Sequence, residues 1–350
     1  MDSLSILLVT LFSFLIAIVI LPPLVRKMRE GQMVGRDVNK RGRPTVPELG
    51  GIATLFAFSI SLSLVIGLKK LLDSPPGPAE PPYLAAIAVF FIAAMIGLID
   101  DISNIRQRVK ALAVLFAALP LLLVHFHDGS YATTEVVVGH LPFGAPPVAL
   151  GTLSLLYWLV LVPLGVTGLA NGMNMSAGYN GLESGQITVV AGSLLLVSGI
   201  THPAGAGGEV SGLVFAAVLG SALGLFAFNR FPARVFVGDI GTLGLGAAIA
   251  AGVVMGGLEI YGLVAIAPAY YEGAAMAYYS FIRPVRDRRR ACHNPVIDAD
   301  GRLSPPKGAE RYTLAYFLLS RKPMTEPRLV ATLLSLYAVS GAVAVVLAAL

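Results

Sequence analysis

The feature that most constrains this chain is a series of apolar segments, each about 20 residues long, that recurs along its whole length. An α-helix of that length crosses the hydrocarbon core of a bilayer. Of the 350 residues, 56% are hydrophobic and 13% are charged, whereas soluble domains have about 25% charged residues. A soluble globule and a disordered chain are therefore excluded, and the alternation typical of a membrane β-barrel is missing. We expect an all-α polytopic membrane protein.

The apolar segments predict about ten transmembrane helices. The first segment follows the acidic Asp2 and precedes Arg26 and Lys27, the reverse of the charge order of a secretory signal, so we interpret it as a retained span. The predicted spans are roughly 4–25, 50–68, 83–99, 111–125, 151–170, 187–201, 211–228, 241–256, 259–282 and 326–349.

Basic residues fall almost entirely on one side of this arrangement. If the spans alternate across the membrane, one set of loops, with Arg328 just beyond them, carries 23 of the 25 lysines and arginines, and the other side has only Lys69 and Lys70. Positive residues favour the cytoplasm, so we predict that these loops are cytoplasmic and that both termini lie outside. Residues 131–143 predict a small external β-hairpin, and 1–350 form a single transmembrane domain. The predicted cytoplasmic loops are 26–49, 100–110, 171–186, 229–240 and 283–325.

An acidic pair follows directly on the third span, in the sequence LIDDISNIRQRVK. The adjacent carboxylates of Asp100 and Asp101 repel each other unless a cation or a proton lies there. If the helix continues, Asp101, Asn104 and Arg108 share one helix face, and Lys110 closes the segment. The segment is a candidate metal and phosphate site, and the alternative is an ordinary solvated turn.

Two further cytoplasmic connections carry amides and an aspartate. NGMNMSAGYNGLESGQ has no basic residue and contains Asn171, Asn174 and Asn180, whose amides can bind a hard cation or read a base or sugar. The alternative is a glycine-rich helix break that amides cap. In NRFPARVFVGDIG, Asp239 precedes an apolar segment, where an aspartate is either a helix N-cap or, beside the other clusters, a ligand.

The last cytoplasmic loop contains five arginines within residues 283–290. Such a group suits a diphosphate, or alternatively the anionic headgroups of the membrane. Two further acids are candidates: Glu48, which precedes the second span, and Glu272, which lies within the ninth. An acid inside a span is a functional candidate, although a structural role among polar tyrosines is the favoured alternative for Glu272.

Together the clusters lie on one side at one depth and suit Mg²⁺ bound to a diphosphate. Magnesium accepts few protein ligands and keeps phosphate oxygens and waters, and phosphoryl transfer depends chiefly on positioning and charge neutralisation. The sequence has no Walker A or Rossmann motif. A transporter is a weaker alternative, because its polar groups would lie near the middle of the membrane on broken helices.

Four motifs carry a family resemblance: VPELGG, LIDDISNIRQRVK, NMSAGYNGLESGQ and RVFVGD, in this order. With them the chain resembles the polyprenyl-phosphate N-acetylhexosamine-1-phosphate transferases of glycosyltransferase family 4, most of all the archaeal and eukaryotic UDP-GlcNAc:dolichyl-phosphate GlcNAc-1-phosphotransferases. The resemblance implies a ten-span catalytic domain that transfers GlcNAc-1-phosphate from UDP-GlcNAc to a polyprenyl (dolichyl) phosphate and releases UMP. This would be the first step of lipid-linked oligosaccharide synthesis for protein N-glycosylation. The alternative is another UDP-sugar, for cell-wall or polysaccharide synthesis.

The resemblance also implies roles for individual residues. Asn174 and Asp239 match the positions that hold Mg²⁺, for which Mn²⁺ is a substitute. Asp100 and Asp101 match the catalytic pair, one of which deprotonates or orients the lipid phosphate, and Lys110 matches a phosphate-contacting lysine. The implied substrate contacts are Glu48 near the uridine, Asn180 at the uracil or nucleoside, Asn171 in the same loop, Asn104, and Arg289, Arg290 and His293 in the last loop.

That last loop departs from the family pattern. The eukaryotic branch has an Arg-His-Arg-type stretch where this chain has RRRACHNP. Either His293 takes the histidine position, with Asn294 where an arginine is expected, or Arg289 and Arg290 do that work. The implied partners are the UDP-sugar, the polyprenyl phosphate and the bilayer, with a homodimer as an option and no nucleic acid. We expect the cell membrane of a prokaryote, with motifs that favour an archaeon.

Overall fold

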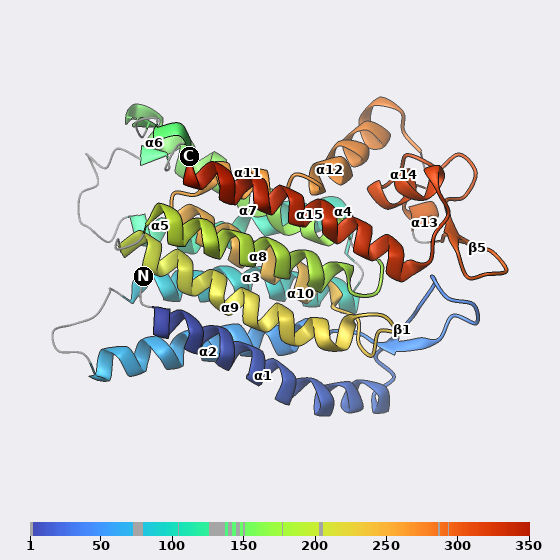
Figure 1. Ribbon diagram of the computed structural model, residues 1–350, viewed down its shortest axis with the longest axis horizontal. Coiled ribbons are helices and arrows are strands. Elements are labelled where there is room, and N and C mark those ends of the chain that lie inside the picture. The colour runs from blue at the N-terminus through green and yellow to red at the C-terminus, as the bar shows by residue number, and fades with distance from the viewer. Residues whose placement is uncertain are drawn as a thin grey trace.

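The computed structural model describes residues 3–72, 80–103, 105–125, 137–138, 142–144, 148–149, 151–176, 178–202, 206–285, 288–292 and 294–350. Most of these residues are helical, and the long helices run along one common direction (Figure 1). Eight helices in the described residues are long and apolar enough to cross a membrane. These are α1 (Ser3–Glu30), α2 (Gly51–Leu72), α3 (Pro81–Ser103), the continuous run of α6 (Ser154–Leu156), η5 (Tyr157–Leu161) and α7 (Val162–Met175), α8 (Leu182–Thr201), α9 (Ala206–Asn229), α10 (Gly238–Met255) and α15 (Glu326–Ala349).

Eight of the ten predicted spans coincide with these helices, which confirms an all-α, multi-pass membrane protein. The other two ranges are broken. In the first, α4 (Gln107–Ala113), η1 (Val114–Ala118) and α5 (Leu119–His125) contain an apolar stretch, Val109–Val124, that is about 24 Å long and shorter than a bilayer core. In the second, α11 (Glu259–Ala265) ends before Pro268, which lacks a backbone N–H, and α12 (Ala269–Ala277) and η6 (Tyr278–Ile282) follow. A total of ten spans stays a prediction.

The predicted external hairpin at 131–143 lies mostly outside the described residues. Within them, β3 (Val137–Val138) pairs antiparallel with β4 (Val148–Ala149), so one strand lies in the predicted range and its partner beyond it. The short helices η3 (Pro142–Gly144) and η4 (Gly151–Leu153) flank β4. The external position of this pair stays a prediction.

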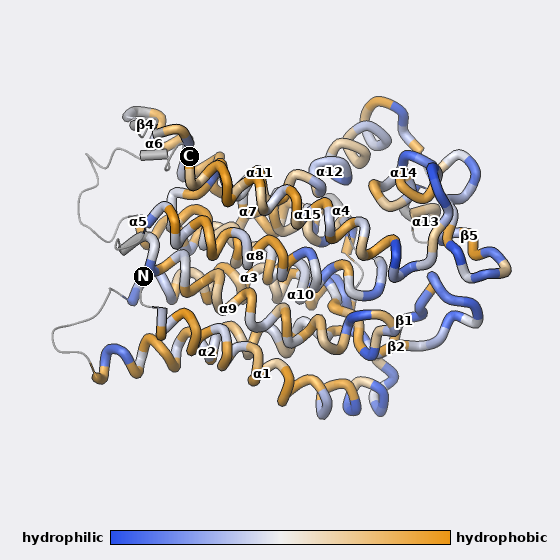
Figure 2. The backbone as a smooth tube through the Cα atoms, in the orientation of Figure 1, coloured by the Kyte–Doolittle hydropathy of each residue, from blue (hydrophilic) through white to orange (hydrophobic). Residues whose placement is uncertain are grey.

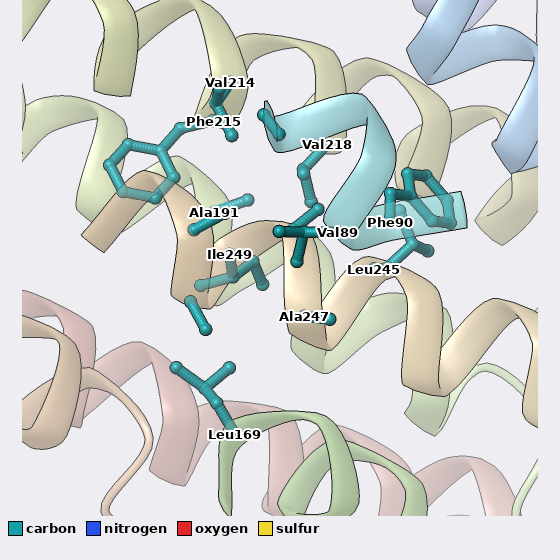
Figure 3. Packing of buried hydrophobic residues seen from close by; sticks show 14 of the residues in the cluster. Val89, Phe90, Leu169, Ala191, Val214, Phe215, Val218, Leu245, Ala247 and Ile249 are labelled. Carbon is teal, nitrogen blue, oxygen red and sulfur yellow. The ribbon is translucent and has the colours of Figure 1, made fainter. Parts of the chain in front are cut away.

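Helix α10 lies at the centre of the bundle, against α2, α3, α7 and α9. Residues 240–253 of this helix are all buried, and most are glycine or alanine. These small residues allow close backbone approach: a Cβ at Gly97 of α3 would lie 2.4 Å from the carbonyl carbon of Asp239, and one at Gly51 would lie 2.3 Å from Cα of Gly241. Larger side chains from α3, α7 and α9 fill the remaining space around α10 (Figure 3).

The outer surface of the bundle is apolar. Helix α1 is strongly hydrophobic, yet it exposes a stripe of apolar side chains at helical spacing: Leu4, Leu7, Leu11, Leu15 and Val19. In water such a stripe would be unfavourable, whereas in a bilayer it contacts lipid. Figure 2 shows this apolar character along the helices and hydrophilic segments concentrated near β1 and β5.

The hydrophilic end of the bundle carries two small hairpins and a helical segment. β1 (Val34–Arg36) pairs antiparallel with β2 (Thr45–Pro47), and β5 (Val296–Ile297) with β6 (Leu303–Ser304). With α13 (Arg288–Cys292) and α14 (Leu314–Arg321), β6 packs on the start of α15 through a separate apolar cluster. Both chain termini lie at the opposite end of the bundle (Figure 1), in agreement with their placement on one common side, while the assignment of that side to the outside stays a prediction.

Candidate active site

Three charged side chains meet where α3 ends and α10 begins. The ammonium Nζ of Lys110, from α4, donates to Oδ2 of Asp100 at 2.8 Å and also to Oδ2 of Asp239. Asp100 additionally accepts from the backbone N–H of Ile105 at 2.7 Å. Asp100 is 7% exposed and Lys110 only 3%, so this contact is largely withdrawn from water. Two carboxylates therefore share one ammonium group at the hydrophilic end of buried helices.

The second acid of the pair has a different environment. Oδ1 of Asp101 accepts from the backbone N–H of Asp239 at 2.9 Å, and Oδ2 accepts from that of Ile240 at 3.1 Å. These N–H groups belong to the first turn of α10, where they have no partner inside the helix. Asp101 thus caps α10 and holds the backbone that carries Asp239. The positive end of the helix dipole favours a carboxylate at this place.

The amide of Asn174 reaches Asp239 from the end of α7. Its Nδ2 donates to Oδ1 of Asp239 at 2.7 Å and to Oγ1 of Thr242 at 2.8 Å. The buried Gln186 fixes the end of α7, because its Nε2 donates to the carbonyl oxygen of Met173 at 2.7 Å. The sequence predicted Asn174 and Asp239 as a pair, and the structure brings them together. Thr242 and Gln186 were not predicted, since only the helix packing shows which side chains they support.

The oxygen-rich surroundings of Asp239 fit a hard divalent cation. Asp239, Asp100, Thr242 and, after a turn of its amide, Asn174 offer oxygen atoms, which are the ligands that Mg²⁺ prefers. Asp101 interacts electrostatically with both Asp239 and Glu48, so acids outnumber the ammonium of Lys110 here. In the described residues, no group of three His, Cys, Asp or Glu side chains could hold a metal ion. Mg²⁺ accepts few protein ligands and takes the others from phosphate and water.

The VPELGG segment packs directly against the RVFVGD segment. The N–H groups of Gly50 and Gly51 donate to the carbonyls of Phe236 and Val237 at 2.8 Å each. The Glu48 side chain lies over Gly35, since a Cβ at Gly35 would lie 1.9 Å from its Oε1. Burial raises the pKa of Glu48 above its ordinary value. The VPELGG and RVFVGD motifs, nearly 200 residues apart in the sequence, are thus joined by backbone hydrogen bonds next to Asp239.

A second polar cluster, not predicted from the sequence, lies around Asn180. We call its five residues, Asp37, Asn39, Lys40, Asn180 and Glu326, the Asp37 cluster. Lys40 forms ion pairs with Asp37 and, at 2.9 Å, with Glu326. Asn180 donates its backbone N–H to Glu326 Oε1 at 2.8 Å and its amide Nδ2 to Asp37 Oδ2 at 2.9 Å. Asn39 Nδ2 donates to the carbonyl of Gly178 at 2.5 Å and to Glu326 Oε1 at 3.3 Å.

The other predicted residues either contact other groups or lie outside the described residues. Asn171 donates its amide to the carbonyl of Thr167 at 2.9 Å, one turn back in its own helix. Asn104 and His293 lie outside the described residues, and α13 contains Arg289 and Arg290, whose side chains also lie outside them. A common helix face for Asp101, Asn104 and Arg108 required the helix to continue, and this condition is not met, because α3 ends at Ser103 and α4 begins at Gln107.

Arg288 of the last loop and Glu272 of the ninth predicted span have structural contacts. Arg288 donates to the carbonyl of Tyr312 at 2.6 Å and lies over the ring of Tyr279. Glu272 is 4% exposed and accepts from the backbone N–H of Leu314 at 2.8 Å, at the start of α14. The favoured alternative for Glu272, a structural role, agrees with this contact.

Comparisons with known proteins agree with the motifs. The model of glycosyl transferase family 4 matches residues 83–257. A protein of Saccharolobus solfataricus, provisionally named a UDP-N-acetylglucosamine–dolichyl-phosphate N-acetylglucosaminephosphotransferase, is 28% identical over 99% of this chain and 98% of its own length. A provisionally named glycosyltransferase of Methanocaldococcus jannaschii is 31% identical over 93% of this chain and 90% of its own length. The phospho-N-acetylmuramoyl-pentapeptide-transferase of Limosilactobacillus reuteri is 27% identical over 72% of this chain and 75% of its own length.

The matched region includes α3, α4, α7 and α10, the helices that carry the acids, the lysine and the amide described above. The match to the Saccharolobus solfataricus protein covers 99% of the chain and therefore reaches α1 and α15. The chain therefore belongs to glycosyl transferase family 4 and is a multi-pass membrane transferase.

Proposed function

We propose that this transferase moves GlcNAc-1-phosphate from UDP-GlcNAc to a polyprenyl (dolichyl) phosphate at the cytoplasmic face of the cell membrane. The products are polyprenyl-diphospho-GlcNAc and UMP, at the start of lipid-linked oligosaccharide synthesis for N-glycosylation, and 1–350 act as a single catalytic domain. The observation that carries the proposal is the contact of Lys110 with both Asp100 and Asp239, beside Asn174, at the hydrophilic end of the bundle. The names of the archaeal relatives support the donor and the acceptor.

The cofactor in this proposal is Mg²⁺, with Mn²⁺ as a substitute. Asp239 and Asn174 would hold it, with the Asn174 amide turned so that its oxygen faces the ion. When bound, the ion would neutralise the charge of the diphosphate. Lys110 would contact phosphate oxygens beside the ion, since its ammonium lies against Asp239.

The reaction that we propose is a displacement at phosphorus. An oxygen of the polyprenyl phosphate forms a bond to the sugar-bearing phosphorus of UDP-GlcNAc. The bond from this phosphorus to the bridging oxygen breaks, and its electron pair leaves with UMP. The acceptor is a phosphate monoester, whose second pKa is near 6, so near neutral pH it is largely deprotonated. Positioning and charge neutralisation therefore matter more than proton abstraction.

The two acids of the pair have separate roles in this proposal. Asp100 holds the ammonium of Lys110 against the reacting phosphates and accepts any proton that the lipid phosphate still carries. Asp101 acts as a positioning residue, because both of its oxygens are bonded to the first N–H groups of α10. Glu48 and Asn180 are assigned to the uridine end. The remaining proposed substrate contacts are Asn104, Asn171, Arg289, Arg290 and His293, and the homodimer stays a prediction.

The test is UMP release by the purified full-length protein with polyprenyl phosphate, across a panel of UDP-sugars with and without Mg²⁺. We expect release with UDP-GlcNAc that requires both lipid and metal. Asp239→Asn should abolish it, while Asp300→Asn, a matched change at an exposed aspartate away from the site, should not. Release only with another UDP-sugar, such as UDP-MurNAc-pentapeptide, would change the donor but keep the chemistry. Metal-independent release, or an active Asp239→Asn variant, would contradict the site.

A further inference from the structure

The Asp37 cluster joins three segments that are far apart in the sequence. Asp37 and Lys40 lie in the turn of the β1–β2 hairpin, which the N–H of Asp37 closes by donating to the carbonyl of Pro44 at 2.9 Å. Asn180 lies between α7 and α8, and Glu326 is the first residue of α15. Asp37 and Glu326 are each 3% exposed, and Lys40 lies between them, so both carboxylates are paired despite their burial.

This cluster fixes the orientation of the Asn180 amide. A carboxylate paired with an ammonium only accepts hydrogen bonds, so the atom that faces Asp37 Oδ2 at 2.9 Å must be the amide nitrogen of Asn180. The backbone N–H of Asn180 is held separately by Glu326. The amide nitrogen keeps one further hydrogen, and the amide oxygen Oδ1 is the side-chain acceptor that remains. In the described part of the chain, no donor reaches it.

We infer that Asp37 is a positioning residue that turns the Asn180 amide so that its oxygen accepts the ring N–H of the donor's nucleobase. This inference rests on the proposed function, which brings a uridine nucleotide to Asn180. Uracil has an N–H at ring position 3, whereas cytosine has an unprotonated nitrogen there. An oxygen held in this orientation therefore pairs with uracil and would face a second acceptor in cytosine, which leaves both acceptors without a hydrogen. Asp37 thus selects the base although it does not touch it.

The neighbouring Glu326 offers a matched comparison. Both acids are buried to the same extent, and both are paired with Lys40. Only Asp37 bonds to the side-chain amide of Asn180, because Glu326 accepts from its backbone. Loss of either charge disturbs the cluster, but only a change at Asp37 frees the amide to turn. Variants of Asp37 and of Glu326 therefore distinguish a role in base selection from a role in local stability.

The experiment is a binding titration of UMP and of CMP against the purified full-length protein in detergent with Mg²⁺. We expect the wild type to prefer UMP, and D37N to lower the UMP:CMP affinity ratio about 10-fold, the value of one lost hydrogen bond. An asparagine at position 37 can donate or accept, so it no longer dictates the orientation. E326Q should keep the wild-type ratio even if both affinities fall. An unchanged ratio in D37N, or an equal loss in E326Q, would overturn the inference.

A charge-conserving exchange provides a variant that keeps the cluster's net charge. In D37N/N180D the amide at position 37 donates to the carboxylate at position 180, whose second oxygen still faces the base as an acceptor. We expect this double variant to restore the preference for UMP that D37N loses, and its failure to do so, with unfolding temperature unchanged, would refute the role of Asp37. The titration measures binding without catalysis, so it tests the inference separately from the proposed function. Preferential UMP binding without any transfer would reject the proposed function alone. Equal binding of UMP and CMP to the wild type would reject the inference.

Discussion

Asp101→Asn tests whether the second acid of the pair acts through structure or through chemistry. The carboxylate accepts two backbone hydrogen bonds of 2.9 and 3.1 Å from the first turn of α10. Asparagine keeps one acceptor oxygen, loses the charge and turns an N–H₂ group toward one of the helix N–H groups. Loss of a charged N-cap at an exposed residue costs about 1 to 2 kcal/mol. We therefore expect the free energy of unfolding to fall by this amount.

The loss of these hydrogen bonds should also lower activity, because the first turn of α10 carries Asp239. If the whole of this free energy appeared in the activation barrier, kcat would fall by about 5- to 30-fold. Because the displaced group is the proposed metal ligand, the Mg²⁺ concentration for half-maximal activity should rise as well. The assay measures UMP release against Mg²⁺ concentration, together with thermal unfolding in detergent, for the wild type, Asp101→Asn and Asp100→Asn. For Asp100→Asn we expect a larger loss of kcat, on the order of 10²- to 10⁴-fold.

One pattern of results would refute this reasoning. If Asp101→Asn unfolded at the wild-type temperature, kept the wild-type Mg²⁺ requirement and still lost kcat by more than about 10²-fold, Asp101 would act on the substrate directly. The division of roles within the pair would then be reversed.

Three further changes follow from the contacts of the site. Gly97→Ala places a methyl group 2.4 Å from the carbonyl carbon of Asp239, so we expect the free energy of unfolding to fall by about 1–3 kcal/mol and UMP release to fall as well. The control is Gly67→Ala, whose methyl group meets nothing within 4 Å. This control should have the unfolding temperature and UMP release of the wild type. Lys110→Met leaves two carboxylates without their shared ammonium, which should abolish UMP release and cost about 3–5 kcal/mol; a variant that kept the wild-type rate would contradict the site. Burial raises the pKa of Glu48 above 4.5, so the folded protein binds more protons than the unfolded chain, and stability should fall as pH rises through the folded pKa. Unfolding temperatures of Glu48→Gln measured across this pH window should lack that part of the decline, and parallel curves for the two proteins would contradict it.

The sequence predicted the long helices because a run of about 20 apolar residues is a local property. It could not predict whether the segments 111–125 and 259–282 form continuous helices, because that depends on tertiary contacts. Pro268 was visible in the sequence, but whether the chain bends there or continues depends on what α11 and α12 pack against. The end of α3 at Ser103 was missed for a similar reason. Asp100 accepts the N–H of Ile105, which stabilises a break where the pattern of polar residues suggested a continuous helix.

Within the candidate site, the residue types were predictable and their pairings were not. Asp239 and Asn174 were expected to lie together, and they do. The cap that Asp101 provides joins residues 138 positions apart, and no local pattern shows which helix N-terminus lies opposite the end of α3. Glu326 resembles any acid in the first turn of a helix. Its partner Lys40 is 286 residues away, so the Asp37 cluster became visible only in three dimensions.

The close packing of α10 also determines how the protein can change over evolutionary time. The neighbours of α10 contact its backbone at glycine positions, so the helix cannot shift or accept larger side chains without a clash. We therefore expect its amide protons to exchange with solvent more slowly than those of the other helices. Asp239 lies in the first turn of this closely packed helix. The hairpins and α13–α14 lie outside that packing, at the hydrophilic end. Under the proposed function, we expect donor specificity to change through substitutions in those outer segments, while the contacts around Asp239 stay the same.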